Sequence, residues 1–178
     1  KVAPPPGAFL QATVHGQDAL TAAVKEAVSG EKGVDLFAGC GTFTLPLAEH
    51  YEMIALESEK PMIAALDRGW REAKGLKKIE AVARDLFRRP FLPDELAKLD
   101  FAVLDPPRAG AEAQVAELAK SEVAQIAYVS CNPVTFARDA KVLINAGYVL
   151  NWVQVVDQFR WSSHVELAAK LSRPHMQR

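Results

Sequence analysis

The sequence has few cysteines, almost no net charge and no long apolar run, and each of these absences excludes a class of protein. Its 178 residues include only Cys40 and Cys131, too few for a disulfide framework or a four-cysteine metal site. No apolar run reaches the ~18 residues of a membrane span, and the proline-rich start has no apolar signal-peptide core. The net charge is −1, whereas a free-standing nucleic-acid-binding protein usually has a basic surface. We therefore expect a cytoplasmic protein with no membrane association and no bound metal.

The chain instead has the regular order of short apolar runs and amphipathic segments that a single α/β domain shows. Its composition, 49% hydrophobic and 24% charged, is ordinary for a globular domain of this length. We predict strands at 33–38, 53–57, 79–83, 101–105 and 125–130, and helices at 17–28, 42–50, 61–74, 111–121 and 134–146. This alternation is typical of parallel βαβ units in a doubly wound sheet.

The order changes after Gly147. Residues 148–156 and 164–171 both have strand character, and only 157–163 separate them, which is too short for a crossover helix. We expect these two strands to pair antiparallel. Residues 1–10 are predicted to be a linker, 11–173 the folded domain and 174–178 a tail.

Polar residues follow the first two predicted strands, where open α/β sheets bind their ligands. Gly39 and Gly41 allow a tight turn and a close approach of backbone to ligand, although a structural turn explains such a pair about as often. A dinucleotide fingerprint would have a third glycine where Thr44 stands, so a dinucleotide site is disfavoured. Glu57 either accepts hydrogen bonds from both hydroxyls of a ribose or is a solvated strand end.

The third and fourth strands are also followed by polar residues. Asp85 either accepts a hydrogen bond from an adenine amino group or caps the turn before Phe87. The fourth strand runs into Asp105-Pro106-Pro107-Arg108, whose two prolines fix the backbone. This segment is either a rigid turn without chemistry or a catalytic loop.

The fifth strand leads into Ser130-Cys131-Asn132-Pro133, which places a thiol at a strand-to-helix corner. Asn132 can cap the following helix and Pro133 suits its first turn. Positive potential at a helix N-terminus favours the thiolate, which is the nucleophilic form of cysteine. A lone cysteine is more often a small buried hydrophobe, so the residue alone does not decide between these interpretations.

Several segments, taken together, resemble a known family. Residues 35–42, followed by an acidic end of the second strand, resemble the cofactor loop of class I S-adenosylmethionine-dependent methyltransferases. Segments spanning nearly the whole chain resemble, in order, the RNA (uracil-5-)-methyltransferase family. They are Phe9-Leu10-Gln11, residues 35–48, residues 105–110, Val129-Ser130-Cys131-Asn132-Pro133 and His164-Val165-Glu166. The resemblance implies a Rossmann-like, mostly parallel, seven-stranded doubly wound sheet with an antiparallel last strand.

The resemblance also implies a reaction and the residues that carry it out. The reaction is transfer of a methyl group from S-adenosylmethionine to C5 of a uridine in transfer or ribosomal RNA. Cys131 corresponds to the nucleophile that adds to C6, and Glu166 to the base that removes the C5 proton. The implied cofactor-binding residues are Gln11, Phe37, Gly39, Gly41, Thr42, Glu57, Asp85 and Asp105. Thr42 departs from the family pattern, in which asparagine is frequent.

Other residues are candidates for binding the substrate. Arg108 suits a uracil or a phosphate because it is a fixed bidentate donor. His164 either orients the catalytic base Glu166 or the substrate, or is a packed or solvated histidine. Phe159 and Trp161 either stack on a flipped base or lie in the core. Cys40, inside the glycine loop, is interpreted as a packing residue.

The predicted topology brings Cys131 and Glu166 together although they are far apart in sequence. If the last strand lies antiparallel beside the strand at 125–130, it begins at the edge of the sheet where Cys131 follows. Without the resemblance, the more ordinary interpretation of Glu166 is an exposed strand residue paired with Arg160.

Family members usually carry an N-terminal RNA-binding OB-fold domain, and some hold an iron–sulfur cluster on four cysteines; this sequence has neither. We therefore expect a monomeric catalytic domain of a longer protein, whose RNA affinity depends partly on a further domain. Two alternatives stay open. One is a methyltransferase of exocyclic amino groups that uses residues 105–108 and leaves Cys131 inert. The other is a non-catalytic module that binds the cofactor or RNA.

Overall fold

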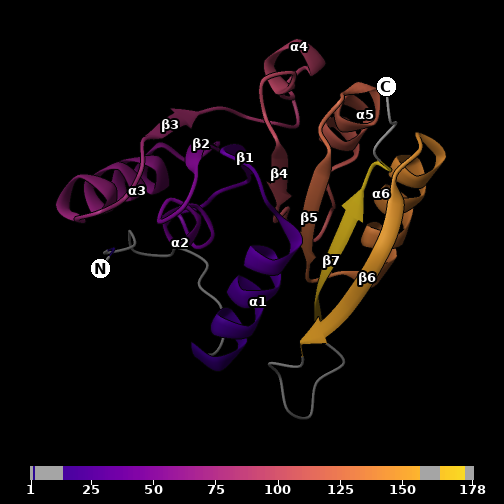
Figure 1. Ribbon diagram of the computed structural model, residues 1–178, viewed down its shortest axis with the longest axis horizontal. Coiled ribbons are helices and arrows are strands. Elements are labelled where there is room, and N and C mark those ends of the chain that lie inside the picture. Colours follow the sequence, from indigo (N-terminus) through magenta and orange to yellow (C-terminus); the bar gives the residue numbers. More distant parts are fainter. Residues whose placement is uncertain (1, 3–13, 157–164, 175–178) are drawn as a thin grey trace.

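The computed structural model describes residues 2, 14–156 and 165–174, and within them a single seven-stranded sheet in the order β3-β2-β1-β4-β5-β7-β6 (Figure 1). The strands are β1 (Lys32–Leu36), β2 (Glu52–Glu57), β3 (Ile79–Ala83), β4 (Phe101–Leu104), β5 (Gln125–Ser130), β6 (Val149–Val156) and β7 (Glu166–Ser172). The first five are mutually parallel, and β7 runs antiparallel to both β5 and β6. The predicted parallel sheet with an antiparallel last strand is confirmed.

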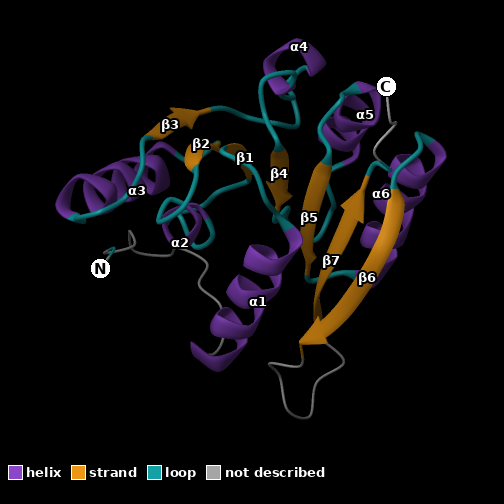
Figure 2. Ribbon diagram, in the orientation of Figure 1, coloured by secondary structure: helices purple, strands orange, loops and turns teal. Residues whose placement is uncertain are grey.

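The described part of the chain has six helices, of which the first precedes β1 and the other five connect successive strands (Figure 2). They are α1 (Val14–Ala27), α2 (Thr44–Leu47), α3 (Lys60–Glu72), α4 (Pro93–Leu96), α5 (Glu112–Lys120) and α6 (Pro133–Asn145). The helix predicted at 42–50 is wrong in length, since α2 covers only Thr44–Leu47. Its late start follows from Pro46, which has no N–H to bond to the carbonyl of Thr42. Helix α4 was not predicted, since its single turn is too short for a helical period. It begins with Pro93, and the Glu95 carboxylate accepts a hydrogen bond from the Leu92 amide at 2.9 Å.

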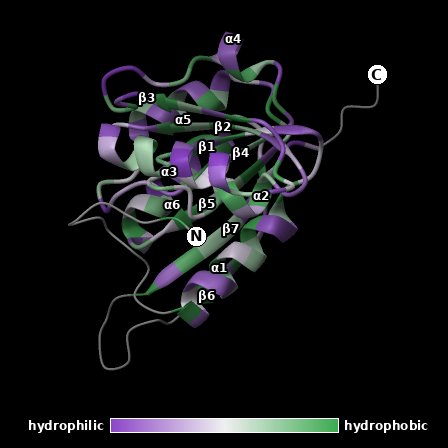
Figure 3. Ribbon diagram, turned by 90° about the vertical axis from the view of Figure 1, so that its left-hand side faces the viewer, coloured by the Kyte–Doolittle hydropathy of each residue, from purple (hydrophilic) through white to green (hydrophobic). Residues whose placement is uncertain are grey.

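Apolar residues pack on both faces of the sheet, as alternation along the strands requires. On β4, Ala102 and Leu104 pack with α4, α5 and α6, whereas Phe101 and Val103 pack with α1 and α2. Figure 3 shows hydrophobic strands running through the centre of the molecule. In the described residues, no helix is both long and apolar enough to cross a bilayer.

This topology places several chain segments at one edge of the sheet. Strands β1, β4 and β5 are adjacent and parallel, so their carboxyl ends lie together. Strand β7 is antiparallel to β5, so it begins at that edge instead of ending there. The edge therefore gathers the loops after three strands and the first residues of a fourth.

Candidate active site

A cavity of about 570 Å³ lies at this edge of the sheet. Its walls come from the loop after β1, the end of β2, the segment after β3, the loop after β4, the residue after β5 and the start of β7. The residues that line it are Phe37, Ala38, Gly39, Cys40, Thr42, Glu57, Ser58, Glu59, Met62, Phe87, Asp105, Pro106, Pro107, Arg108, Cys131 and Glu166. The predicted site residues of five different segments thus share one cavity.

The loop after β1 is held tightly against the end of β2. Gly39 has φ +55°, a left-handed conformation that glycine adopts without a steric cost. Its amide donates to Glu57 Oε2 at 3.1 Å. The other carboxylate oxygen, Glu57 Oε1, accepts from Ser58 Oγ at 2.9 Å and from the Glu59 amide at 3.0 Å. Glu57 therefore fixes the glycine loop, and its carboxylate also lines the cavity.

Two aromatic rings form another wall of the cavity. Phe37 also adopts a left-handed backbone, with φ +68°, and its ring centroid lies 5.5 Å from that of Phe87. Left-handed backbone is unusual for an aromatic residue and is found where the surrounding structure imposes it. Phe87 is 49% exposed and had no role in the sequence prediction. The signal that could have identified it was its position two residues after Asp85.

The Asp85 side chain caps a turn. Its Oδ1 accepts from the backbone amides of Phe87, at 3.0 Å, and Arg88, at 3.3 Å. Of the two alternatives for Asp85, the structure shows the turn cap. Among the described residues, Asp85 and Gly41 are the two predicted cofactor-binding residues that do not line the cavity. Gly41 instead has φ +95°, and its amide closes a turn onto the carbonyl of Ala38 at 2.9 Å.

Cys131 lies between the end of β5 and the start of α6, and it is half-buried. Asn132 caps the helix as predicted, because its Oδ1 accepts from the Val134 amide at 3.1 Å. The expectation of a favoured thiolate is not met. Burial raises the pKa of the Cys131 thiol, Asp105 and Glu166 raise it further, and Arg108 opposes them. The thiol therefore needs a nearby base or a positive charge before it can act as a nucleophile.

Glu166 is the first residue of β7 and is only 3% exposed, so its interpretation as an exposed strand residue is wrong. Leu167 pairs with Ser130, which places Glu166 and Cys131 each one residue beyond that pair. Burial raises the pKa of the Glu166 carboxyl. A carboxylate in such a place is a stronger base than one in water.

Two more carboxyl groups lie near the cavity, the half-buried Asp105 and the buried Asp35. Burial, together with Asp35 and Glu166, raises the pKa of Asp105 from its ordinary 3.8 to about 8. Asp35 lies inside β1, where burial raises its pKa to about 7 although Thr44 Oγ1 donates to its Oδ2 at 2.6 Å. Within the described residues, Asp35 Oδ1 has no hydrogen-bond partner. No separate role for Asp35 was predicted from the sequence.

These features define what the cavity can hold. The aromatic pair suits a flat ring, the Glu57 carboxylate suits a pair of hydroxyl groups, and the buried carboxyl groups favour a positive charge. A nucleoside that carries a cation has a flat ring, a pair of hydroxyl groups and a positive charge. By contrast, in residues 2, 14–156 and 165–174 no group of three or more potential metal ligands occurs. Gln11, His164, Phe159 and Trp161 lie outside the described residues.

Comparison with known proteins identifies the family. The family model described as tRNA (Uracil-5-)-methyltransferase matches residues 7–174. The chain belongs to this family. The resemblance found in the sequence is thereby confirmed, and so is its fold.

Two proteins with similar sequences carry the names of RNA methyltransferases. An uncharacterized RNA methyltransferase of Mesorhizobium japonicum is 51% identical over 178 residues, which cover 99% of this chain and 43% of that protein. A 23S rRNA (uracil(1939)-C(5))-methyltransferase of Chromohalobacter salexigens is 40% identical over 172 residues, covering 94% of this chain and 35% of that protein. The chain thus spans less than half the length of these curated relatives.

A solved structure supports the same family. The tRNA (uracil-54, C5)-methyltransferase of Pyrococcus abyssi, in complex with S-adenosyl-L-homocysteine, superposes with a TM-score of 0.81 at 34% identity. The match covers 93% of this chain and 40% of that one. Family membership fixes the fold and the class of protein, while the roles of individual residues remain predictions.

Proposed function

We propose that this chain transfers a methyl group from S-adenosylmethionine to C5 of a uridine in transfer or ribosomal RNA, through a covalent bond between Cys131 Sγ and C6. The observation that carries the proposal is the meeting of Cys131 and Glu166 in a cavity that also suits a charged nucleoside. The names of the Chromohalobacter and Pyrococcus proteins agree with this reaction.

The proposed site would hold the cofactor through residues of the first two strand ends and the fourth. Glu57 would accept the ribose hydroxyls, Phe37 and Phe87 would contact the adenine, and Asp105 would face the positive charge. When bound, S-adenosylmethionine supplies an electrophilic methyl group and a sulfonium charge that lowers the pKa of neighbouring acids. Gln11, Thr42 and Asp85 remain predicted cofactor contacts.

Cys131 would activate the uracil. C5 of uracil is a poor nucleophile, and addition of a thiolate to C6 turns C5 into an enolate carbon that can attack a methyl group. This is covalent catalysis, which divides one difficult step into easier ones. Arg108, which lines the same cavity, would hold the uracil or a phosphate.

Glu166 would complete the reaction. After C5 has acquired the methyl group, the C5 proton must leave so that the C6–S bond can break and the C5–C6 double bond can re-form. A buried carboxylate next to Cys131 suits this proton transfer. His164 remains a predicted substrate contact.

RNA would also need contacts beyond this chain. With a net charge of −1, the chain has little of the positive charge that phosphate binding requires. Its relatives are more than twice as long, so a further domain would supply part of the RNA affinity. We propose that it acts as a monomer in the cytoplasm.

A methyl-transfer assay tests the proposal. The protein, in the full length that its gene encodes, is incubated with isotope-labelled S-adenosylmethionine and RNA from cells that lack the gene, and the RNA is then digested to nucleosides. We expect labelled 5-methyluridine from the wild type and none from Cys131→Ala. A label on an exocyclic amino nitrogen, kept in Cys131→Ala, would establish the amino-group alternative instead. Cofactor binding without any labelled nucleoside would favour the non-catalytic module.

A further inference from the structure

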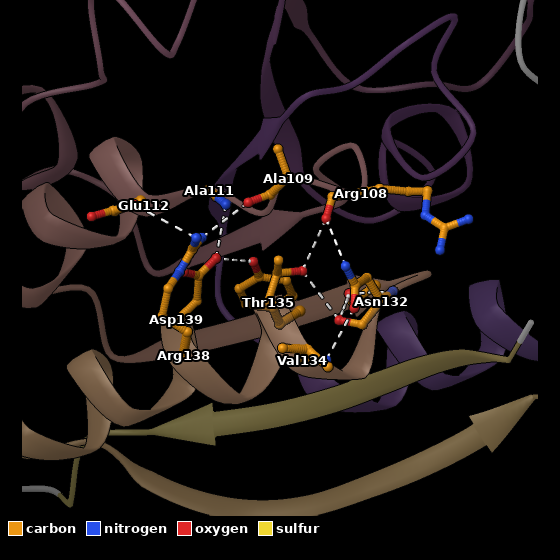
Figure 4. Close-up of polar contacts among 11 residues, drawn as sticks. Arg108, Ala109, Ala111, Glu112, Asn132, Val134, Thr135, Arg138 and Asp139 are labelled. Atoms are coloured by element: carbon orange, nitrogen blue, oxygen red, sulfur yellow. Dashed lines mark hydrogen bonds and ion pairs between the residues drawn. The ribbon is translucent and has the colours of Figure 1, made fainter.

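The loop that follows β4 is fastened to α6 by a series of hydrogen bonds (Figure 4). The carbonyl oxygen of Arg108 accepts from Asn132 Nδ2 at 3.0 Å and from Thr135 Oγ1 at 3.2 Å. One residue later, the carbonyl of Ala109 accepts from Arg138 Nη2 at 3.1 Å. Successive peptide groups of this loop are therefore held by side chains of the same helix.

The far end of the loop is held by a buried carboxylate. Asp139 is 1% exposed, and its Oδ2 accepts from the Ala111 amide at 2.8 Å and from the Tyr128 hydroxyl at 2.6 Å. Its Oδ1 accepts from Arg138 Nε at 2.8 Å. This cluster connects the loop to α6 and to β5, the two elements on either side of Cys131.

The loop also lies too close to α6 to move without breaking these contacts. Gly110 has φ +81°, and a Cβ atom there would come within 2.5 Å of Arg138 and 2.8 Å of Asp139. Only glycine fits such a position. The backbone of the loop is thus fixed relative to the helix that begins after Cys131.

The same loop carries residues that line the cavity, among them Asp105 and Arg108. In Figure 4 the Arg108 carbonyl points toward Asn132 and Thr135, while its guanidinium points away from them. From this geometry we infer that Asn132 and Thr135 are positioning residues, which hold the Arg108 backbone so that its side chain stays beside Cys131 for the proposed reaction. The catalytic role in this inference rests on the proposed function, but the position of the Arg108 side chain beside Cys131 can be tested without RNA or cofactor.

The reactivity of the Cys131 thiol depends on whether the Arg108 side chain lies beside it. Among the described groups that face the thiol, Asp105 and Glu166 raise its pKa and Arg108 lowers it. If Arg108 moves away, the pKa of Cys131 rises and the thiol reacts more slowly at a given pH. Loss of Asn132 and Thr135 as donors should therefore shift the pH profile in the same direction as loss of the Arg108 charge.

The experiment measures alkylation of Cys131 by iodoacetamide as a function of pH, quantified on the Cys131 peptide by mass spectrometry. It compares the wild type, Arg108→Gln and the double variant Asn132→Ser/Thr135→Val. Serine still caps the helix, and valine keeps the shape of threonine. The double variant loses both donors to Arg108, and with them the bond from Thr135 Oγ1 to the Asn132 carbonyl at 3.2 Å. Thr135→Ser keeps the hydroxyl, and Val134→Ala changes a side chain of the same helical turn that is 77% exposed; both serve as controls. Thermal unfolding confirms that each variant is folded at the assay temperature.

We expect the double variant and Arg108→Gln to shift the profile toward higher pH, and the two controls to match the wild type. In the methylation assay, kcat of the double variant should fall by about 10-fold or more, since small misplacements of reacting groups are costly. A double variant with the wild-type profile, beside a shifted Arg108→Gln, would overturn the inference and leave the proposed function intact. If the proposed function is wrong, the wild type makes no 5-methyluridine in the methylation assay, and this result does not depend on the alkylation profiles.

Discussion

Cys131 and Glu166 each lie one residue beyond the Ser130–Leu167 pair, which is the last pair of the antiparallel ladder between β5 and β7. The antiparallel direction of β7 is what brings them together. A parallel last strand would place Glu166, its first residue, at the opposite edge of the sheet. The reversal of one strand thus gives the cavity both a thiol and a buried carboxyl group.

Replacement of Glu166 by glutamine should separate the two halves of the proposed reaction. Cys131 can still add to C6 and C5 can still be methylated, but the C5 proton has no base to remove it. We expect turnover to fall by roughly 10²–10⁴-fold and a covalent protein–RNA complex to accumulate with unmodified RNA. A denaturing gel with labelled RNA detects the complex. The exposed Glu80→Gln serves as the control, and equal turnover in Glu166→Gln and Glu80→Gln would refute the role of Glu166.

Glu57→Gln should weaken the binding of S-adenosylmethionine. Glutamine removes the charge that strengthens hydrogen bonds to the ribose hydroxyls and to the Gly39 amide. Loss of about 1.5–3 kcal/mol corresponds to roughly 10- to 100-fold weaker binding, which isothermal titration calorimetry measures. Glu52→Gln changes the exposed opposite end of the same strand and should bind like the wild type. Unchanged affinity in Glu57→Gln would remove the residue from the cofactor site.

The buried Asp35–Thr44 contact should contribute to stability. Thr44→Val removes the hydroxyl that donates to Asp35 Oδ2 at 2.6 Å and leaves the buried carboxyl group without that donor. We expect the free energy of unfolding to fall by about 1–3 kcal/mol in a urea titration. Thr44→Ser keeps the donor and should lose less. If Thr44→Ser and Thr44→Val are equally destabilised, the loss comes from packing and not from the hydrogen bond.

Asp105→Asn should make the protein more stable at alkaline pH. Because the pKa of Asp105 is about 8 when folded and 3.8 ordinarily, the folded state binds more protons than the unfolded state between these values. The wild type therefore loses stability as the pH rises through this window, and asparagine removes that loss. Unfolding at about pH 8.5 should show the variant ahead by up to about 5 kcal/mol, and the gain should shrink near pH 5. Asp18→Asn changes an exposed carboxyl group and should be as stable as the wild type at each pH. If Asp105→Asn gains the same stability at every pH, the Asp105 carboxyl is not held protonated in the folded protein.

The fold could be predicted from the sequence because its strands are apolar runs separated by segments of helical length. The strands at 79–83 and 125–130 were predicted to the residue. The length of helix α2 could not be predicted, since it depends on the missing Pro46 donor and on the turn around Gly41.

The candidate site was predicted only where a residue stands at a strand end or in a family motif. Cys131, Glu57 and Asp105 met this condition. The contact of Phe37 with Phe87, and the packing of residues 107–111 on α6, join segments that are distant in sequence. No local period encodes such contacts, so only the structure shows them.

The most direct test uses RNA that contains 5-fluorouridine, because fluorine at C5 cannot be removed as a proton and the C6–S bond then persists. The full-length protein is incubated with this RNA and S-adenosylmethionine, and the adduct is mapped to a peptide by mass spectrometry. We expect a methylated adduct on Cys131 that is absent in Cys131→Ala and retained in Cys40→Ala. No adduct from a protein that binds both cofactor and RNA, or an adduct on another residue, would contradict the proposed mechanism.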